Sequence, residues 1–215
     1  EKLFDEAHKN VGYYRAMETS LEGIPLVLAR TGWSGEISYE LYLRNHKLGN
    51  QLWEIVREAG LEFNITPIAP NAIRSIEGGL LSYASDILRE DTPFSIGLNR
   101  LVDTNQSVEF IGKAALKKIE EEGTKRKLVG IVVEGNPIKS PPEQFWPVLD
   151  NDLKIGHVSR CIYSPRLDKN IGFANVPIEF SDIDMTFSIS TPDGDKMATV
   201  CKWPWFPAER INKKT

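Results

Sequence analysis

The sequence predicts an α+β region followed by a small all-β domain, either a sandwich or a barrel. Two observations support this prediction. In the first part, apolar runs typical of strands alternate with stretches of helical periodicity. After Gly123 the pattern changes to short alternating runs, which are separated by turn signals such as Asn136-Pro137 and Asp193-Gly194. We therefore place an α+β domain at residues 1–124 and a β domain at residues 125–215.

The first elements of the α+β domain are expected to be short. Residues 1–10 are polar and predicted to be helical, and 11–17 resemble a short strand. A turn at 21–24 leads into 25–29, a continuous apolar run typical of a buried strand. Residues 45–59 then carry apolar side chains near the 3.6-residue period of a helix, with Gly60 just past its end.

Further along, the pattern predicts a strand at 61–68 and a helix at 72–81. Pro70 lies near the start of that helix and Asn71 is able to cap it, while Gly78 and Gly79 fall inside it. An extended segment at 93–102 and a helix at 114–122 follow. In the second domain we expect six strands, at 128–134, 147–149, 155–163, 170–176, 185–190 and 198–203.

Composition argues against several classes of protein. The 215 residues are 41% hydrophobic and 26% charged, as is ordinary for a soluble globular protein. The net charge is −4 and no dense basic block occurs, which argues against nucleic acid as a partner. No apolar run approaches a membrane span and no secretory segment is visible, so the sequence predicts a cytoplasmic protein without membrane contact.

Cysteine and histidine usage predicts no metal site. Cys161 and Cys201 lie far apart in the sequence, and the three histidines lack ligand spacing. A disulfide is open in principle, but we expect two buried, reduced thiols. The first residue is Glu1 and not Met, so we expect either a processed chain or a piece of a longer one.

The most informative stretch is Arg30 to Leu43, which reads R-T-G-W-S-G-E-I-S-Y-E-L-Y-L. Its glycines allow a sharp turn or close approach to a ligand. The following alternation places Glu40 and Tyr42 on one strand face, next to a turn that carries Trp33. A carboxylate beside two aromatics is suited to a flat nitrogen heterocycle or a cation. An amphipathic strand with a solvated polar face is the structural alternative.

These residues resemble the R-x-G-[YW]-[ST]-G-E segment of the glycine-cleavage T-protein (aminomethyltransferase) family. Three further segments resemble the same family in order, and together the four cover nearly the whole chain. They are R-S-I-E-G-G-L-L-S-Y-A-S-D-I (residues 74–87), F-I-G-K-A-A-L (residues 110–116) and G-H-V-S-R-C-I-Y-S-P-R-L-D-K-N-I-G-F-A (residues 156–174). The resemblance implies a folate-binding α/β region followed by a small β-barrel domain.

Within this family, the chain most resembles the tetrahydrofolate-dependent dimethylsulfoniopropionate demethylases. Trp33 replaces the usual Tyr, Tyr42 adds a second aromatic, and Pro70-Asn71 stands where T-proteins have an Arg that helps to hold the folate. The resemblance implies methyl transfer from a sulfonium donor to N5 of tetrahydrofolate. The alternatives are aminomethyl transfer, O- or N-demethylation by the same fold, and non-catalytic folate binding.

The resemblance also implies roles for individual residues. Glu40 would accept hydrogen bonds from the pterin, with Trp33, Asn71 and Tyr83 as further cofactor-binding residues. Trp33 and Tyr42 would border the methyl donor, and packing is the structural alternative for the aromatic residues. Arg74 is expected to form a structural ion pair.

The family's acidic residue near the reacting centre lies in an N-terminal stretch that has no counterpart in this chain. We therefore assign no catalytic residue and expect a separate, removed or lost N-terminal half. A small-molecule methyl donor is the other expected partner.

Overall fold

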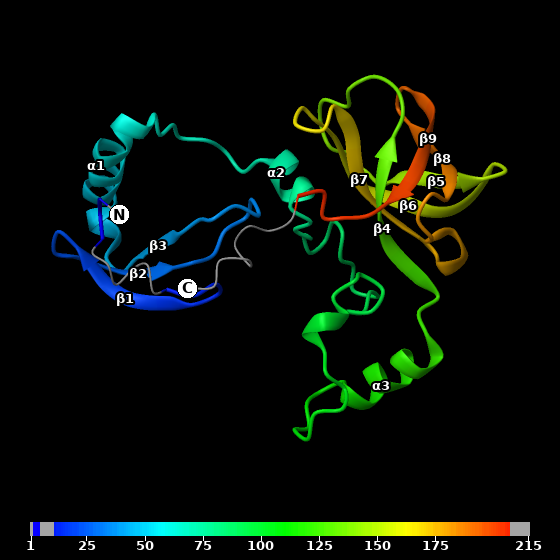
Figure 1. Cartoon of the computed structure of the whole chain (residues 1–215), viewed down its shortest axis with the longest axis horizontal. Coiled ribbons are helices and arrows are strands. Elements are labelled where there is room, and N and C mark those ends of the chain that lie inside the picture. The colour runs from blue at the N-terminus through cyan, green and yellow to red at the C-terminus, as the bar shows by residue number, and fades with distance from the viewer. Residues whose placement is uncertain (1, 5–10, 207–215) are drawn as a thin grey trace. The chain divides into compact units, whose positions relative to one another are not determined.

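The computed structural model describes residues 2–4 and 11–206, which form two compact units (Figure 1). The first unit extends to Arg74 and the second runs from Ser75 to Phe206. Most of the helix expected at residues 1–10 lies outside the described residues. No helix in the described ranges is long and apolar enough to cross a membrane.

The first unit is built on a three-stranded antiparallel sheet in the order β1-β2-β3. Its strands are β1 (Ala16–Leu21), β2 (Ile24–Ala29) and β3 (Glu40–Leu43). Glu22 and Gly23 connect β1 and β2, and both have positive φ, as a two-residue hairpin turn of type I′ requires. The predicted turn and the strand after it are thereby confirmed, while the strand expected at 11–17 begins later, at Ala16.

Helix α1 (Gly49–Gly60) packs its apolar side against this sheet (Figure 1). A short 3-10 helix, His46–Leu48, precedes it, and the Asn45 side chain accepts a hydrogen bond from the Lys47 N–H at 3.1 Å. The helix predicted at 45–59 is confirmed. The core between helix and sheet consists of Val11, Leu21, Ile24, Leu26, Leu28 and Leu52, with Leu41, Leu43, Ile55 and Val56 at its edge.

The strand predicted at 61–68 is wrong. Residues Leu61–Phe63 form a 3-10 helix, and Asn64 follows it with a left-handed backbone. The N–H of Ile65 then donates to the Gly60 carbonyl at 3.2 Å. The chain therefore folds back on the end of α1, and the alternating apolar residues belong to a helix terminus.

Helix α2 (Ala72–Glu77) is shorter than predicted. The Asn71 side chain caps it by accepting a hydrogen bond from the Ile73 N–H at 2.8 Å, as the sequence predicts. The helix ends before Gly78 and Gly79, so the predicted extension to residue 81 is wrong. Gly79 has φ +66°, a conformation in which glycine commonly terminates a helix. An added Cβ there would lie 2.9 Å from Cβ of Pro204, so the close approach of Pro204 also requires glycine.

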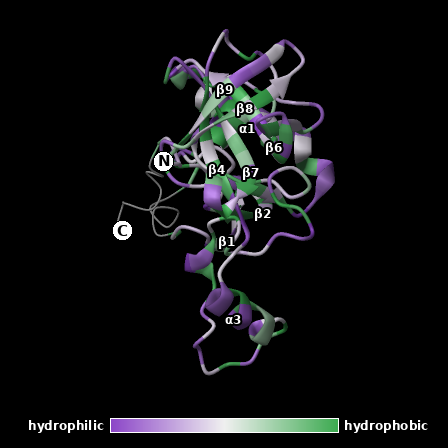
Figure 2. Cartoon of the chain, turned by 90° about the vertical axis from the view of Figure 1, so that its right-hand side faces the viewer, coloured by the Kyte–Doolittle hydropathy of each residue, from purple (hydrophilic) through white to green (hydrophobic). Residues whose placement is uncertain are grey.

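The extended segment predicted at 93–102 is also wrong. The N–H of Leu98 donates to the Pro93 carbonyl at 2.8 Å, and Asn99–Leu101 form a 3-10 helix, so the segment is a series of tight turns. Helix α3 (Lys113–Glu122) confirms the helix predicted at 114–122. Its surface is largely hydrophilic, as Figure 2 shows, and it has no buried residue.

The second unit contains a closed six-stranded barrel in the order β4-β7-β6-β5-β8-β9, as the fold class predicted. Alternating apolar residues fill it, and Figure 2 shows them along the strands. Each predicted β run overlaps one strand: β4 (Arg126–Val133), β5 (Trp146–Asp150), β6 (Leu153–Ser164), β7 (Lys169–Pro177), β8 (Thr186–Thr191) and β9 (Gly194–Cys201). The runs predicted at 128–134, 185–190 and 198–203 each extend one or two residues beyond the strand. The fully buried core includes Ile131, Val148, Val158, Cys161, Ala174, Val176, Ile189 and Ala198.

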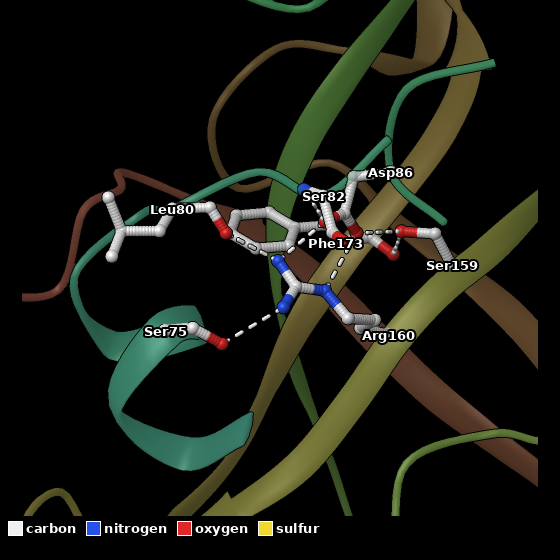
Figure 3. A network of polar contacts seen from close by, with 7 residues as sticks. All are labelled: Ser75, Leu80, Ser82, Asp86, Ser159, Arg160 and Phe173. Atoms are coloured by element: carbon white, nitrogen blue, oxygen red, sulfur yellow. Dashed lines mark hydrogen bonds and ion pairs between the residues drawn. The ribbon is translucent and has the colours of Figure 1, made fainter. Parts of the chain in front are cut away.

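A buried ion pair joins the segment after α2 to the barrel (Figure 3). Arg160 on β6 binds Asp86 through two nitrogens, Nε at 3.0 Å and Nη2 at 2.5 Å. Its remaining donors reach the Ser75 hydroxyl at 3.0 Å and the Leu80 carbonyl at 2.6 Å. Because every guanidinium nitrogen has a partner, the cost of burying the two charges is offset within the network.

A second buried carboxylate lies at the end of α2. Glu77 accepts a hydrogen bond from the Ser164 hydroxyl at 2.5 Å and pairs with Arg166 at 3.4 Å. Its backbone carbonyl accepts the N–H groups of Trp205 and Phe206. These contacts explain why residues 75–98 form one unit with the barrel. The predicted division between residues 124 and 125 lies just before β4 and stays a prediction, whereas the compact units divide after Arg74.

Candidate functional site

The strand alternation predicted around Glu40 is present in β3. Glu40 pairs with Ala29 of β2 and Tyr42 with Val27, so both side chains lie on the same face of the sheet. Leu41 and Leu43 point the other way and pack against the core. Glu40 and Tyr42 are exposed, so the polar face of β3 is accessible to a ligand.

Two hydroxyl groups meet one oxygen of the Glu40 carboxylate. Thr31 donates its side-chain hydrogen bond to Oε2, and the Tyr42 hydroxyl donates to the same atom at 3.1 Å. The hydrogen bond to Glu40, and then the charge of that carboxylate, raise the pKa of Tyr42 above its ordinary value of 10.0. The phenol therefore stays protonated at neutral pH and serves as a donor to Glu40. Sequence reasoning singled out Glu40 and Tyr42 but missed Thr31.

The glycine-rich turn before β3 is fixed by contacts of its own. A Cβ on Gly32 would fall 1.7 Å from the Ser38 hydroxyl oxygen, which donates to the Thr31 carbonyl at 3.0 Å. Gly35 has φ +79°, a conformation that favours glycine. The turn carries Trp33, whose side chain is 50% exposed. These glycines thus serve the folding of the loop, and Trp33 is left accessible at its tip.

An apolar cavity of about 470 Å³ lies on the opposite side of β3. Tyr39 and Leu41 line it together with Leu28 of β2 and Val56 of α1. Tyr39 and Leu41 share one face of the alternating strand, whereas Glu40 and Tyr42 share the other. The cavity is therefore separate from the Glu40 carboxylate.

The other residues that sequence reasoning singled out have local partners. Asn71 caps α2 through its side-chain oxygen, which gives it a structural role. Arg74 forms the predicted ion pair, with Glu36 at 3.7 Å. Tyr83 belongs to the second unit, where its backbone bridges Ile87 and its side chain is 71% exposed. The binding roles of Asn71 and Tyr83 stay predictions.

The second unit has a polar cavity of about 650 Å³ that the sequence did not predict. Its walls include Asp91, Arg126, His157 and Asn175. Arg126 donates to the Asn175 side chain at 2.7 Å, and Asn175 donates to Asp91 at 3.4 Å. Burial, and next the charge of Arg126, lower the pKa of His157, which stacks on Phe145 with ring centres 4.5 Å apart. Arg126 also donates to the Ile155 carbonyl at 3.0 Å, and Asp91 accepts the Leu88 N–H at 2.8 Å. These local hydrogen bonds account for the polar residues structurally.

Comparison with known proteins gives matches along nearly the whole chain. The GCVT N-terminal domain model matches residues 1–106, and the glycine cleavage T-protein C-terminal barrel domain model matches residues 126–207. Dimethylsulfoniopropionate demethylase DmdA of Ruegeria pomeroyi is 33% identical over 205 residues, which are 95% of this chain and 55% of that protein. An aminomethyltransferase of Geobacillus is 35% identical over 191 residues, 88% of this chain and 51% of that protein.

A solved structure shows the same fold. The glycine cleavage system aminomethyltransferase T from Bartonella henselae superposes with a TM-score of 0.78 at 18% identity, over 93% of this chain and 54% of that one.

The chain thus has a two-part architecture. An α+β unit carries a carboxylate on its edge strand β3, and a closed antiparallel barrel follows it. With both family models matched in order, the chain belongs to the glycine cleavage T-protein family. It spans about half the length of the relatives it matches.

Proposed function

We propose that this chain is the C-terminal portion of a tetrahydrofolate-dependent methyltransferase. In this proposal, a methyl group moves from a sulfonium donor such as dimethylsulfoniopropionate to N5 of tetrahydrofolate. The observation that carries the proposal is the Glu40 carboxylate, exposed on β3 with its Oε1 atom free of partners among the described residues. The similarity to a dimethylsulfoniopropionate demethylase along 95% of the chain supports the choice of donor.

The chemistry of Glu40 fits a reduced pterin. An ionised carboxylate only accepts hydrogen bonds, and it has about four lone-pair positions. Two of these are used by hydroxyls at Oε2, which leaves Oε1 for the ring N–H and exocyclic amino group of a pterin. Hydrogen bonds to a charged acceptor are about twice as strong as neutral ones, so this residue would supply much of the affinity.

Two exposed aromatics close to Glu40 in sequence suit a cationic donor. Trp33 and Tyr42 are 50% and 54% exposed, so their rings are available for contact. An aromatic face attracts a poorly hydrated cation by about 0.5–2 kcal/mol. Because the Tyr42 hydroxyl is engaged with Glu40, its contribution to the donor would come from the ring face.

The reaction requires alignment more than acid–base groups. Tetrahydrofolate, when bound, would supply the N5 lone pair that takes the methyl group, while the C–S electrons leave on a neutral sulfide and the N5 proton passes to water. Glu40 would fix the orientation of the acceptor, and Trp33 with Tyr42 would hold the donor and exclude water. Such alignment alone accounts for a large part of the rate enhancement of a bimolecular transfer.

The first experiment is a titration of tetrahydrofolate, under anaerobic conditions, against the chain with and without an N-terminal region of the family. Glu40→Ala should abolish binding. Glu58→Ala removes an exposed carboxylate from α1 of the same unit and should leave the affinity unchanged. Wild-type affinity in the Glu40→Ala variant would remove the central assignment.

A panel of methyl donors distinguishes between the candidate enzymatic activities. Dimethylsulfoniopropionate, dimethylglycine and vanillate would be scored for formation of 5-methyltetrahydrofolate. Trp33→Ala should raise KM about tenfold for a sulfonium donor and leave kcat nearly unchanged, because the contact is made in ground state and transition state alike. Trp53→Ala replaces an exposed tryptophan of α1 and is the matched control. An unchanged KM would rule out the aromatic contact.

Aminomethyl transfer is the second candidate function. The Geobacillus aminomethyltransferase is 35% identical to this chain, close to the demethylase value, so it is supported by comparable similarity. Asn71 weighs against it, because Asn71 cannot supply the charge of the Arg expected there and its side-chain oxygen caps α2. A product formed only with an aminomethyl donor would favour this candidate.

The proposal includes a separate N-terminal half as a partner. The chain covers 55% and 51% of two relatives, which motivates this partner. An intact-mass measurement of the natural product tests it. A mass near 24.2 kDa would favour a two-chain assembly or a non-catalytic folate-binding protein, and a mass about twice as large would favour a single-chain enzyme.

A further inference from the structure

We infer that Thr31 is a positioning residue that acts through Glu40. Together with Tyr42, it holds Oε2 of the carboxylate so that Oε1 is presented to the ligand. This inference rests on the proposed folate-binding role of Glu40 and assigns a residue that the sequence did not single out.

The geometry of the two hydroxyls carries the inference. Thr31 precedes the turn and Tyr42 lies two residues beyond Glu40 on the same strand face, so the donors approach Oε2 from different segments. Oε1 has no partner within the described residues. The carboxylate is therefore held at one oxygen and open at the other.

Thr31 itself is fixed by the loop that contains it. Its carbonyl accepts the Ser38 hydroxyl at 3.0 Å, and the absence of a side chain on Gly32 permits that approach. A hydroxyl on a closed loop has few alternative positions. It can therefore restrict the Glu40 side chain before a ligand arrives.

This restriction has a consequence for binding. An exposed glutamate samples several rotamers, and a ligand that needs one of them must offset the lost conformational entropy. The two hydroxyl contacts already restrict the Glu40 rotamers in the free protein, so most of this entropy is lost before the ligand binds. A ligand at Oε1 therefore meets a preorganised acceptor. The same contacts leave the charge of the carboxylate in place, which favours an N–H donor as ligand.

The binding test uses tetrahydrofolate titrated against single and double variants. Thr31→Val keeps the branched shape and removes the hydroxyl, and it should weaken binding about tenfold. Thr31→Ser restores the hydroxyl and should bind within about twofold of wild type. In a Glu40→Gln background, Thr31→Val should cause a clearly smaller loss than in wild type, because Thr31 acts through the residue at position 40. An equal loss in both backgrounds, or an unchanged affinity for Thr31→Val, would overturn the inference.

A second readout does not depend on folate. The NMR order parameter of the Glu40 methylene groups in the free chain should fall in Thr31→Val and be restored in Thr31→Ser. An unchanged order parameter in Thr31→Val overturns the inference, whatever the binding result. In contrast, a Glu40→Ala variant that binds tetrahydrofolate normally overturns the proposed function, so the two failures are distinguishable.

Discussion

At the scale of single residues, Tyr42 reports directly on its contact with Glu40. Ionisation of the phenol would break its hydrogen bond and place two negative charges side by side, which is why the pKa lies above 10.0. Glu40→Gln should return the pKa of Tyr42 toward 10. In the wild-type chain, the hydrogen bond from Tyr42 to Glu40 should be lost as the pH rises through the pKa of Tyr42. NMR of ¹³C-labelled tyrosine measures this titration.

Tyr163 supplies an internal control for that titration. Its hydroxyl donates to Asp168 at 2.5 Å, and this bond raises its pKa in the same way. Glu40→Gln should leave the Tyr163 titration unchanged. If Tyr42 titrates identically in wild type and Glu40→Gln, the hydrogen bond to Glu40 is absent in solution.

Sequence reasoning placed Glu40 and Tyr42 on one face because a strand has a fixed period of two. It could not place Thr31, nine residues away, because that contact depends on how the intervening turn closes. The only signal was the density of glycine and small polar residues between Thr31 and Ser38. Such a pattern predicts a turn but not which hydroxyl faces which carboxylate.

At the scale of elements, the barrel strands were predictable and the helix ends were not. Alternation with frequent turn signals identifies a buried antiparallel strand with little ambiguity. Gly79 appeared to be inside a helix, yet its positive φ and the contact with Pro204 end α2 early. Ile65 appeared to belong to a strand, yet its N–H closes the terminus of α1. Both errors arise from contacts that local periodicity does not contain.

The Arg160–Asp86 pair makes a prediction about how the segment after α2 is held. Arg160→Met should lower the free energy of unfolding by about 3–5 kcal/mol, because it leaves the buried Asp86 charge without its partner. Denaturant titration measures the loss. Lys118→Met is the matched control, since it breaks an exposed pair with Glu122 and should cost less than about 0.5 kcal/mol. Equal losses would mean that the buried pair contributes no more than a surface pair.

At the scale of the whole molecule, the fold class followed from the sequence because the two halves have different periodicities. The family models match residues 1–106 and 126–207. The extent of the second compact unit could not be predicted. Residues 75–98 join the barrel through buried polar contacts such as Glu77–Ser164, which leave no periodic signal in the sequence.

The two cysteines report on opening of the barrel as a whole. Both are free, and Cys161 is buried as expected, whereas Cys201 is only partly buried. Burial raises the pKa of Cys161 to about 12 and that of Cys201 to about 11. At pH 8 the native chain should therefore react slowly with a thiol reagent, whereas the unfolded chain should react rapidly at both sites. Fast reaction of Cys161 in the native chain would contradict its burial.

The two thiols also determine the direction in which the stability of the chain changes at high pH. Their pKa values are higher in the folded chain than the ordinary 9.0, so deprotonation favours the unfolded state. Their effect on stability is absent well below pH 9 and becomes destabilising as pH rises from 9 toward 11. Denaturant unfolding across this pH range, carried out on Cys161→Ser, Cys201→Ser and the double variant, would measure the contribution of each thiol to the free energy of unfolding.

The contrast between a closed ring and an open sheet has a consequence for handling this protein. In the closed barrel, β4 pairs with both β7 and β9, so the barrel has no unpaired strand edge that another molecule could extend. In the order β1-β2-β3, by contrast, the outer margins of β1 and β3 keep backbone groups that no strand of the described sheet satisfies. Self-association of the isolated chain should therefore begin at the sheet, and solubilising changes belong on β1 and β3.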